Sequence, residues 1–94
     1  MRLSEQQIVN FKQSVIALDS KAKIYLFGSR ADDKAKGGDI DLAILSNTLE
    51  MEDEWKIKEN YYQQFEEEKI DLLVVKPPFD NPFWLYVKSK AVLL

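Results

Sequence analysis

The sequence predicts an α/β two-layer sandwich, in which a three-stranded mixed sheet carries helices on one face. Three short β-prone runs occur along the chain, and segments with helical periodicity lie between or beside them. Hydrophobic residues make up 46% of the 94 residues, which is enough for a packed core. The expected order is helix, strand, helical turn, strand, helix, strand, helix. This length fits one domain, so we expect residues 1–94 to form a single domain.

The first expected element is a helix that begins after Ser4. Ser4 and Gln7 form a capping-box pattern, which satisfies the first free N–H groups of a helix. Apolar residues then recur at positions 8, 11, 15 and 18, so one face of the helix is apolar. We expect this helix to end near Asp19.

Two strands with a polar loop between them are expected next. Residues Lys23–Phe27 are a β-prone run that stops at Gly28. The polar residues that follow, with a glycine pair at 37 and 38, indicate a loop with a helical turn at its start. Residues 39–45 alternate in a way that suits a strand with one carboxylate face and one apolar face.

A long helix is expected over residues 50–68. Large apolar and aromatic side chains at positions 51, 55, 62 and 65 lie near one face of such a helix. Acidic residues crowd its first turn, where the helix dipole favours negative charge.

The last third of the chain predicts a strand and a short helix. Residues 69–76 carry the strongest strand pattern, and the prolines at 77 and 78 end it. Asn81 as a cap and Pro82 as the first helical residue indicate a helix that continues to about Lys90. Residues 91–94 are a short apolar tail.

The composition excludes several kinds of site. Without cysteine there is no disulfide and no thiolate zinc site, and without histidine there is no imidazole base or ligand. Any metal must be held by oxygen, which favours Mg²⁺, Mn²⁺ or Ca²⁺. The net charge of −3 and a pI near 4.9 argue against autonomous binding of nucleic acid.

Neither a targeting segment nor a membrane span is expected. The N-terminus turns polar within its first residues, unlike a signal peptide. No apolar run approaches the roughly 20 residues that a transmembrane helix needs. We therefore expect a soluble cytoplasmic protein.

Three carboxylates on two of the expected strands form the candidate site. Asp39 and Asp41 are two residues apart on one strand, so their side chains share a side, with Cα atoms about 6.6 Å apart. Two carboxylates held that way repel each other unless a cation lies between them. If the helices cover the Ile70 side of the third strand, Asp71 emerges on the same open face. Asp71 could then hold a second metal ion and accept the proton of an attacking hydroxyl.

Gly28 and Ser29 are candidates for phosphate binding at the end of the first strand. Gly28 lets the backbone approach a phosphate because no Cβ stands in the way. Ser29 offers a hydroxyl and an N–H group at the start of a helical turn, where anions bind. A triphosphate and a metal ion would thus be bound from two adjacent strands.

These residues resemble the signature of the DNA polymerase β-like nucleotidyltransferase superfamily. Residues 27–31 read Phe-Gly-Ser-Arg-Ala, and after a loop residues 38–42 read Gly-Asp-Ile-Asp-Leu. Residues 69–72 fall where this superfamily has its third carboxylate strand, so the resemblance covers nearly the whole chain. The chain is most similar to the minimal branch, the MNT domains that are often paired with HEPN-domain toxins.

The resemblance implies the nucleotidyltransferase fold and a specific reaction. A nucleoside monophosphate passes from a triphosphate, usually ATP, to an acceptor hydroxyl, which in MNT–HEPN systems is a tyrosine of the toxin. It implies that Gly28, Ser29 and Arg30 bind the nucleotide. It also implies that a catalytic set of carboxylates holds two Mg²⁺ ions: Asp39, Asp41 and Asp71.

Two departures from the signature leave alternatives open. Asp32 and Asp33 stand where the family often has Arg-Gly, and Gly38 stands where it often has serine. A non-catalytic antitoxin that occludes its partner is therefore a second hypothesis. A small-molecule nucleotidyltransferase is a third, although so short a chain has little room for an acceptor pocket. The aromatic residues of the last helix suggest a partner or a homodimer interface.

Overall fold

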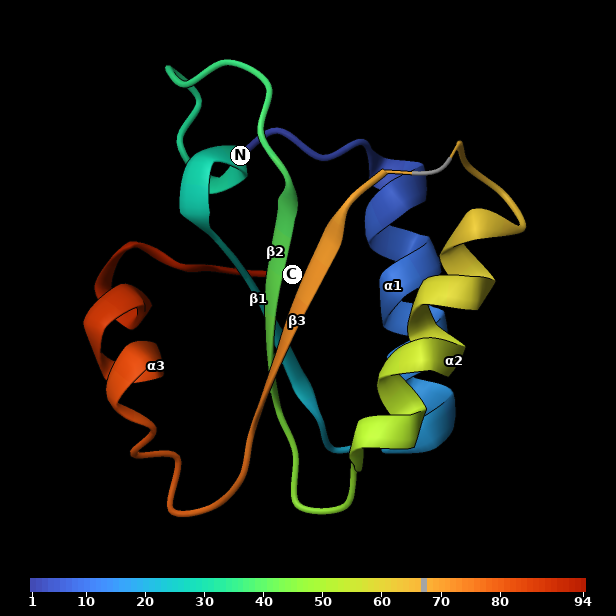
Figure 1. The fold of residues 1–94 in the computed structure, drawn as a ribbon, viewed down its shortest axis with the longest axis vertical. Coiled ribbons are helices and arrows are strands. Elements are labelled where there is room, and N and C mark those ends of the chain that lie inside the picture. The colour runs from blue at the N-terminus through green and yellow to red at the C-terminus, as the bar shows by residue number, and fades with distance from the viewer. Residues whose placement is uncertain (67) are drawn as a thin grey trace.

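The computed structural model describes residues 1–66 and 68–94 and confirms the α/β class (Figure 1). Its order of elements matches the expected one through α3, after which η2 and β4 are additional, and the expected helical turn is the 3-10 helix η1. In chain order the elements are α1 (Glu5–Leu18), β1 (Lys23–Phe27), η1 (Gly28–Ala31), β2 (Ile40–Leu45), α2 (Met51–Tyr62), β3 (Ile70–Val75), α3 (Pro82–Val87), the 3-10 helix η2 (Lys88–Lys90) and β4 (Val92–Leu93).

The sheet has four strands in the order β3-β2-β1-β4, not the expected three. Strand β2 is parallel to β3 and antiparallel to β1, and β4 is antiparallel to β1. The additional strand comes from the apolar tail, whose Leu94 N–H also donates to the carbonyl of Ile24 at 2.9 Å. A strand of two residues has no periodicity, so the sequence pattern could not reveal it.

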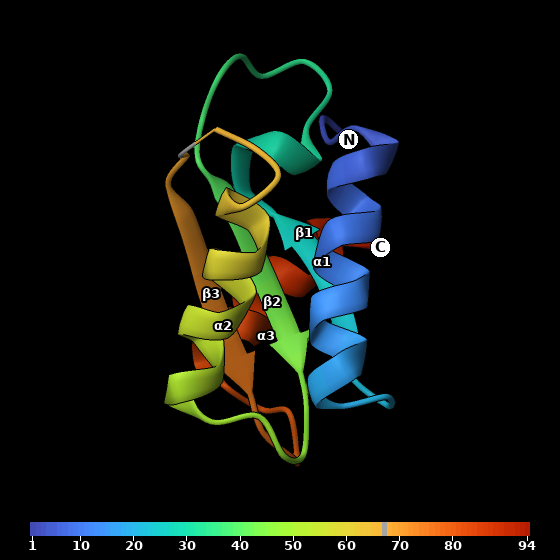
Figure 2. The same ribbon diagram turned by 90° about the vertical axis from the view of Figure 1, so that its right-hand side faces the viewer.

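The helices cover both faces of the sheet, so the expectation of helices on one face is wrong for α3. Helices α1 and α2 lie on one side of the sheet and α3 on the other (Figures 1 and 2). The reason is that the strands are apolar on both faces. Leu26 and Leu42 face the core under α1 and α2, whereas Ala43 and Val75 pack against Trp84 of α3.

The main core is built where α1 and α2 meet the sheet. Phe11 of α1 and Tyr61 of α2 are both fully buried, and their rings stack with centroids 4.8 Å apart. Val15 and Ile57 are fully buried beside them, which confirms the predicted apolar face of α1.

Helix α2 differs from the expected helix in its face and its end. It buries Ile57 and Tyr61, whereas Met51 and Trp55 are 82% and 66% exposed. It ends at Tyr62 rather than at residue 68, and Glu67 in the expected stretch lies outside the described residues.

The two predicted helix caps are confirmed. The Gln7 N–H donates to Ser4 Oγ at 3.1 Å, and the Ser4 N–H donates to Gln7 Oε1 at 2.8 Å. The Asn81 side chain accepts from the N–H groups of Phe83 and Trp84 at 2.9 and 3.1 Å.

No described helix has the length and apolar character that crossing a membrane requires.

Candidate functional site

The register of the sheet brings Asp41 and Asp71 together. Asp41 of β2 is the direct parallel partner of Asp71 of β3, and on its other side it is the partner of Phe27, the last residue of β1. Partners in a ladder share a face and lie on strands about 4.8 Å apart. Both carboxylates therefore lie at the end of the sheet where η1 begins, because Phe27 directly precedes η1. They lie on the face that carries α3, because Asp41 alternates with Ala43 and Asp71 alternates with Leu73 and Val75, which pack in the cluster of Trp84.

Asp41 is the electrostatic centre of this cluster. Partial burial is the largest of the causes that raise the pKa of Asp41 from 3.8 to about 6, and the charges of Asp71 and Asp39 contribute to the same rise. Ionised Asp41 is therefore in an environment with excess negative charge. A cation beside these carboxylates would relieve that repulsion.

Lys69 places a positive charge beside these carboxylates. Its ammonium lies 3.6 Å from Asp39 Oδ2 and 4.0 Å from Asp71 Oδ2, and both carboxylates are about half exposed. Within residues 1–66 and 68–94, no group of three acidic side chains forms a ready-made metal site. The oxygen donors and the charge of this cluster fit a divalent cation. Two of the three carboxylates, however, already contact the Lys69 ammonium.

Gly28 brings the bend after β1 against Asp41. Its φ is +73°, in the left-handed region, and a Cβ built on it would overlap Asp41 Oδ2. Only glycine allows this approach without a shift of backbone or side chain. The predicted phosphate-binding bend and the predicted metal-binding aspartate are therefore in contact.

Gly38 has a related role for Ser29. Its φ is +92°, and a Cβ on Gly38 would overlap Ser29 Oγ. The serine that the family often has at this position would collide with the Ser29 hydroxyl. The departure at Gly38 thus has a structural reason in this chain.

Arg30 is engaged with the protein itself. Its Nε donates to the carbonyl of Gly38 at 3.2 Å, its Nη1 donates to the carbonyl of Arg2 at 3.3 Å, and its Nη2 lies 3.7 Å from Glu68 Oε2. These contacts tie η1 to the loop that follows it. Nucleotide binding by Arg30 stays a prediction.

Arg2 is a site-organising residue that the sequence reasoning missed. Its guanidinium donates to the carbonyls of Ser29 at 3.0 Å, Gly37 at 2.7 Å and Asp32 at 3.2 Å. It therefore holds both ends of the loop between η1 and β2. An arginine before the first helix belongs to no periodic pattern, so no sequence signal marked it.

The two additional acids of the loop are used in local contacts. Asp33 forms an ion pair with the amino group of Met1, and Asp32 accepts from the N–H of Lys34 at 2.9 Å. Asp32 also lines a hollow next to Ser29. Only Asp32 therefore stands near the predicted phosphate position.

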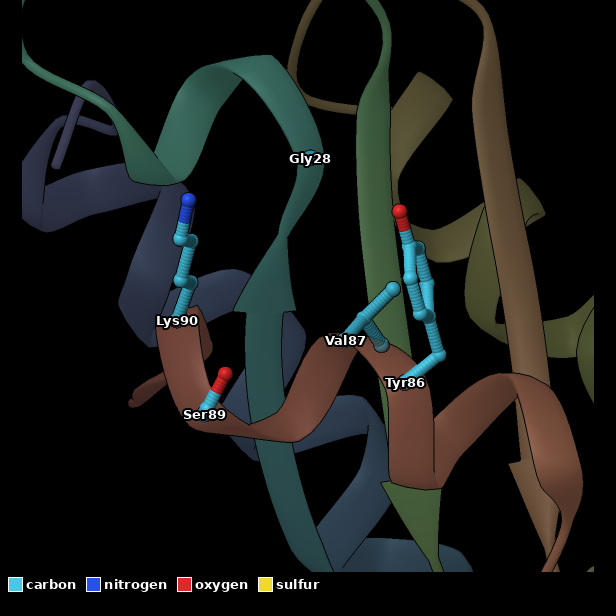
Figure 3. Close-up of a pocket in the computed structure, with 5 residues that line it drawn as sticks. All are labelled: Gly28, Tyr86, Val87, Ser89 and Lys90. Carbon is cyan, nitrogen blue, oxygen red and sulfur yellow. The ribbon is translucent and has the colours of Figure 1, made fainter.

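A cleft separates the bend at Gly28 from the C-terminal helical segment (Figure 3). Its volume is about 340 Å³, within the range of small-molecule sites. An adjacent hollow of about 400 Å³ extends past Ser29 and Ala31. Five residues line the cleft: Gly28, Tyr86, Val87, Ser89 and Lys90.

Comparison with protein families identifies the family of this chain. The family model described as polymerase beta, nucleotidyltransferase, matches residues 6–94. This span contains every candidate site residue named above. A comparison with curated proteins gives no match.

Proposed function

Because the chain belongs to the polymerase beta nucleotidyltransferase family, we propose that it transfers the nucleoside monophosphate of ATP to a hydroxyl group of a protein partner. We propose a HEPN-domain protein as the partner, because the sequence resembles MNT domains, which are often paired with such proteins. One observation carries the proposal, which is that Asp41 lies between its ladder partner Asp71 and the bend at Gly28. This reaction would take place in the cytoplasm, where ATP is available.

In this proposal the bend binds the triphosphate and the carboxylates bind the metal ions. Gly28 and Ser29 would hold the triphosphate through backbone N–H groups and the serine hydroxyl, since Gly28 has no Cβ of its own to keep a phosphate away. Asp39, Asp41 and Asp71 would hold Mg²⁺, with two ions expected. Bound Mg²⁺ would neutralise charge on the triphosphate and on the departing pyrophosphate.

The chemical step needs a base near the acceptor. The acceptor oxygen attacks the α-phosphorus, the bond from this phosphorus to the bridging oxygen breaks, and pyrophosphate leaves. The proton of the acceptor hydroxyl passes to a carboxylate. Asp71 is the group that we propose for this role, because its side chain is 51% exposed and can reach a partner's hydroxyl.

Label transfer tests this proposal. The protein is incubated with ATP labelled at the α-phosphate, Mg²⁺ and the protein encoded by the adjacent reading frame, and the partner is then analysed for label. We expect labelling by the wild type and at least about a hundredfold less with Asp41→Asn or Asp71→Asn. Asp80→Asn, an exposed aspartate outside the cluster, is the matched control and should label as the wild type does. Undiminished labelling by the Asp41 and Asp71 variants would reject the catalytic roles.

The second candidate function is that of an antitoxin that only occludes its partner. The position of Lys69 favours it, because this ammonium already neutralises Asp39 and Asp71 without a metal ion. In this case the partner would be neutralised equally by the wild type and by Asp41→Asn, and no label would be transferred. Measuring the partner's activity in the same reactions separates the two functions.

A further inference from the structure

We propose that Lys90 and Tyr86 bind the substrate nucleotide from the wall of the cleft opposite Gly28. Lys90 would contact the triphosphate and Tyr86 would stack on the base. This inference rests on the proposed function, because a triphosphate on Gly28 and Ser29 would lie along the cleft and the adjacent hollow. It assigns two binding residues that lie outside the motif at residues 27–42.

The geometry of the two hollows supports this placement. The cleft and the adjacent hollow share two lining residues, Gly28 and Lys90, and Ser29 belongs to the adjacent hollow. A ligand on the Gly28–Ser29 bend therefore has the segment from Tyr86 to Lys90 as its opposite wall. The elements come from distant parts of the chain, and the sheet brings them together, since β4 follows η2 and pairs with β1.

Lys90 is suited to the phosphate position by charge and by availability. Its side chain extends from η2 toward η1 (Figure 3). Among the ion pairs and side-chain hydrogen bonds of residues 1–66 and 68–94, none involves Lys90. Arg30, the cation that the motif suggests, is instead occupied with Gly38, Arg2 and Glu68. Lys90 also brings positive charge to a hollow that the acidic Asp32 lines.

Tyr86 is suited to a base because its ring is exposed at the edge of the cleft. Trp84 fills the core under α3, whereas Tyr86 is 81% exposed. The Tyr86 ring stands beside Val87 and points along the cleft in the same general direction as Lys90 (Figure 3). Stacking of a base on an aromatic ring tolerates every base, so Tyr86 would add affinity without selecting adenine.

Calorimetric titration of the full chain with two probes tests each residue separately. The probes are the α,β-methylene analogue of ATP and inorganic tripolyphosphate, both with Mg²⁺. We expect Lys90→Ala to weaken both about tenfold, as loss of one phosphate contact does, and Lys90→Arg to retain binding. We expect Tyr86→Ala to weaken only the nucleotide, by about tenfold, and Tyr86→Phe to bind as the wild type. Lys88→Ala is the matched control, because Lys88 lies on the same 3-10 helix but does not line the cleft.

Failure of this inference is distinguishable from failure of the proposed function. If the wild type binds neither probe, the proposed function fails. If the wild type binds both and Gly28→Ala does not, while Lys90→Ala and Tyr86→Ala bind normally, only the present inference is overturned. Equal weakening of tripolyphosphate by Tyr86→Ala would overturn the base contact. Circular dichroism checks that each variant still folds. If Lys90→Ala or Tyr86→Ala does not fold, Lys90→Arg and Tyr86→Phe are compared with the wild type instead.

Discussion

Replacing Asp41 with asparagine should stabilise the metal-free protein at neutral pH. Burial and the charges of Asp71 and Asp39 raise the pKa of Asp41 to about 6, so its ionised form is disfavoured in the fold. The rise from 3.8 corresponds to at most about 3 kcal/mol at pH 7. Because Asp41 is partly exposed and solvent screens its charge, we expect a gain of about 1 kcal/mol. In a domain of this size the midpoint of thermal unfolding would rise by roughly 4–8 °C.

The pH dependence of this gain follows from the direction of the pKa shift. As pH rises from 3.8 to about 6, the unfolded chain releases the Asp41 proton while the folded chain keeps it, so wild-type stability falls. Asparagine has no such proton. The variant's advantage should therefore be absent below pH 3.8, grow through this window and be complete above about pH 6.

Urea unfolding in EDTA, followed by circular dichroism at pH 3.5 and 7.5, measures the difference. Asp80→Asn is again the control for removal of an exposed carboxylate. A variant that is no more stable than the wild type at pH 7.5, or equally more stable at both pH values, would show that the charge of ionised Asp41 does not destabilise the fold. Added Mg²⁺ should stabilise the wild type more than Asp41→Asn, because the variant lacks a ligand.

Three further predictions concern the surroundings of the site. Gly28→Ala and Gly38→Ala should each lower the free energy of unfolding by about 1 kcal/mol or more, because both glycines have positive φ and no room for a Cβ, and calorimetry should show loss of nucleotide binding. Asp19→Asn should destabilise the protein at pH 7, and this loss should shrink as pH falls below 3.8, because hydrogen bonds from the Ser46 hydroxyl and a backbone N–H lower the pKa of Asp19; a pH series of unfolding midpoints measures this. Trp84→Ala should cost about 3 kcal/mol in urea unfolding because Trp84 is 4% exposed; a loss below 1 kcal/mol would show that α3 does not seal this face of the sheet.

Local chemistry made much of the fold predictable. The capping box at Ser4, the strand that stops at Gly28 and the asparagine and proline that open α3 each act within a few residues, so their signals are complete in the sequence. The position of α3 was not predictable in this way. The face of the sheet that α3 covers depends on which strands become neighbours. Strand pairing joins residues that are far apart in the sequence, so no local pattern reveals it.

The same distinction applies to the site. The alternation around Asp39 and Asp41 predicted a carboxylate face, and the structure places Asp71 on that face. The contact of Lys69 with two of these carboxylates depends on the parallel pairing of β2 with β3, two strands that α2 separates in the sequence.

The cleft wall opposite Gly28 could not be predicted from sequence patterns for another reason. Tyr86 and Lys90 resemble ordinary surface residues of a short helix, and only the pairing of β4 with β1 brings their segment beside Gly28. Sequence reasoning expected the aromatic residues of this helix to contact a partner, which stays a prediction. The nucleotide contact that we propose for Tyr86 would use one of these aromatic residues within the chain itself.

A crystal structure with Mn²⁺ and the α,β-methylene analogue of ATP tests whether these carboxylates bind metal beside the Gly28 bend. We expect an anomalous manganese peak about 2–2.5 Å from oxygens of Asp41 and Asp71, the triphosphate on the Gly28 bend, and the Lys69 ammonium moved away from both carboxylates. A bound nucleotide elsewhere, or Lys69 still between Asp39 and Asp71 with no metal beside Asp41, would contradict this prediction.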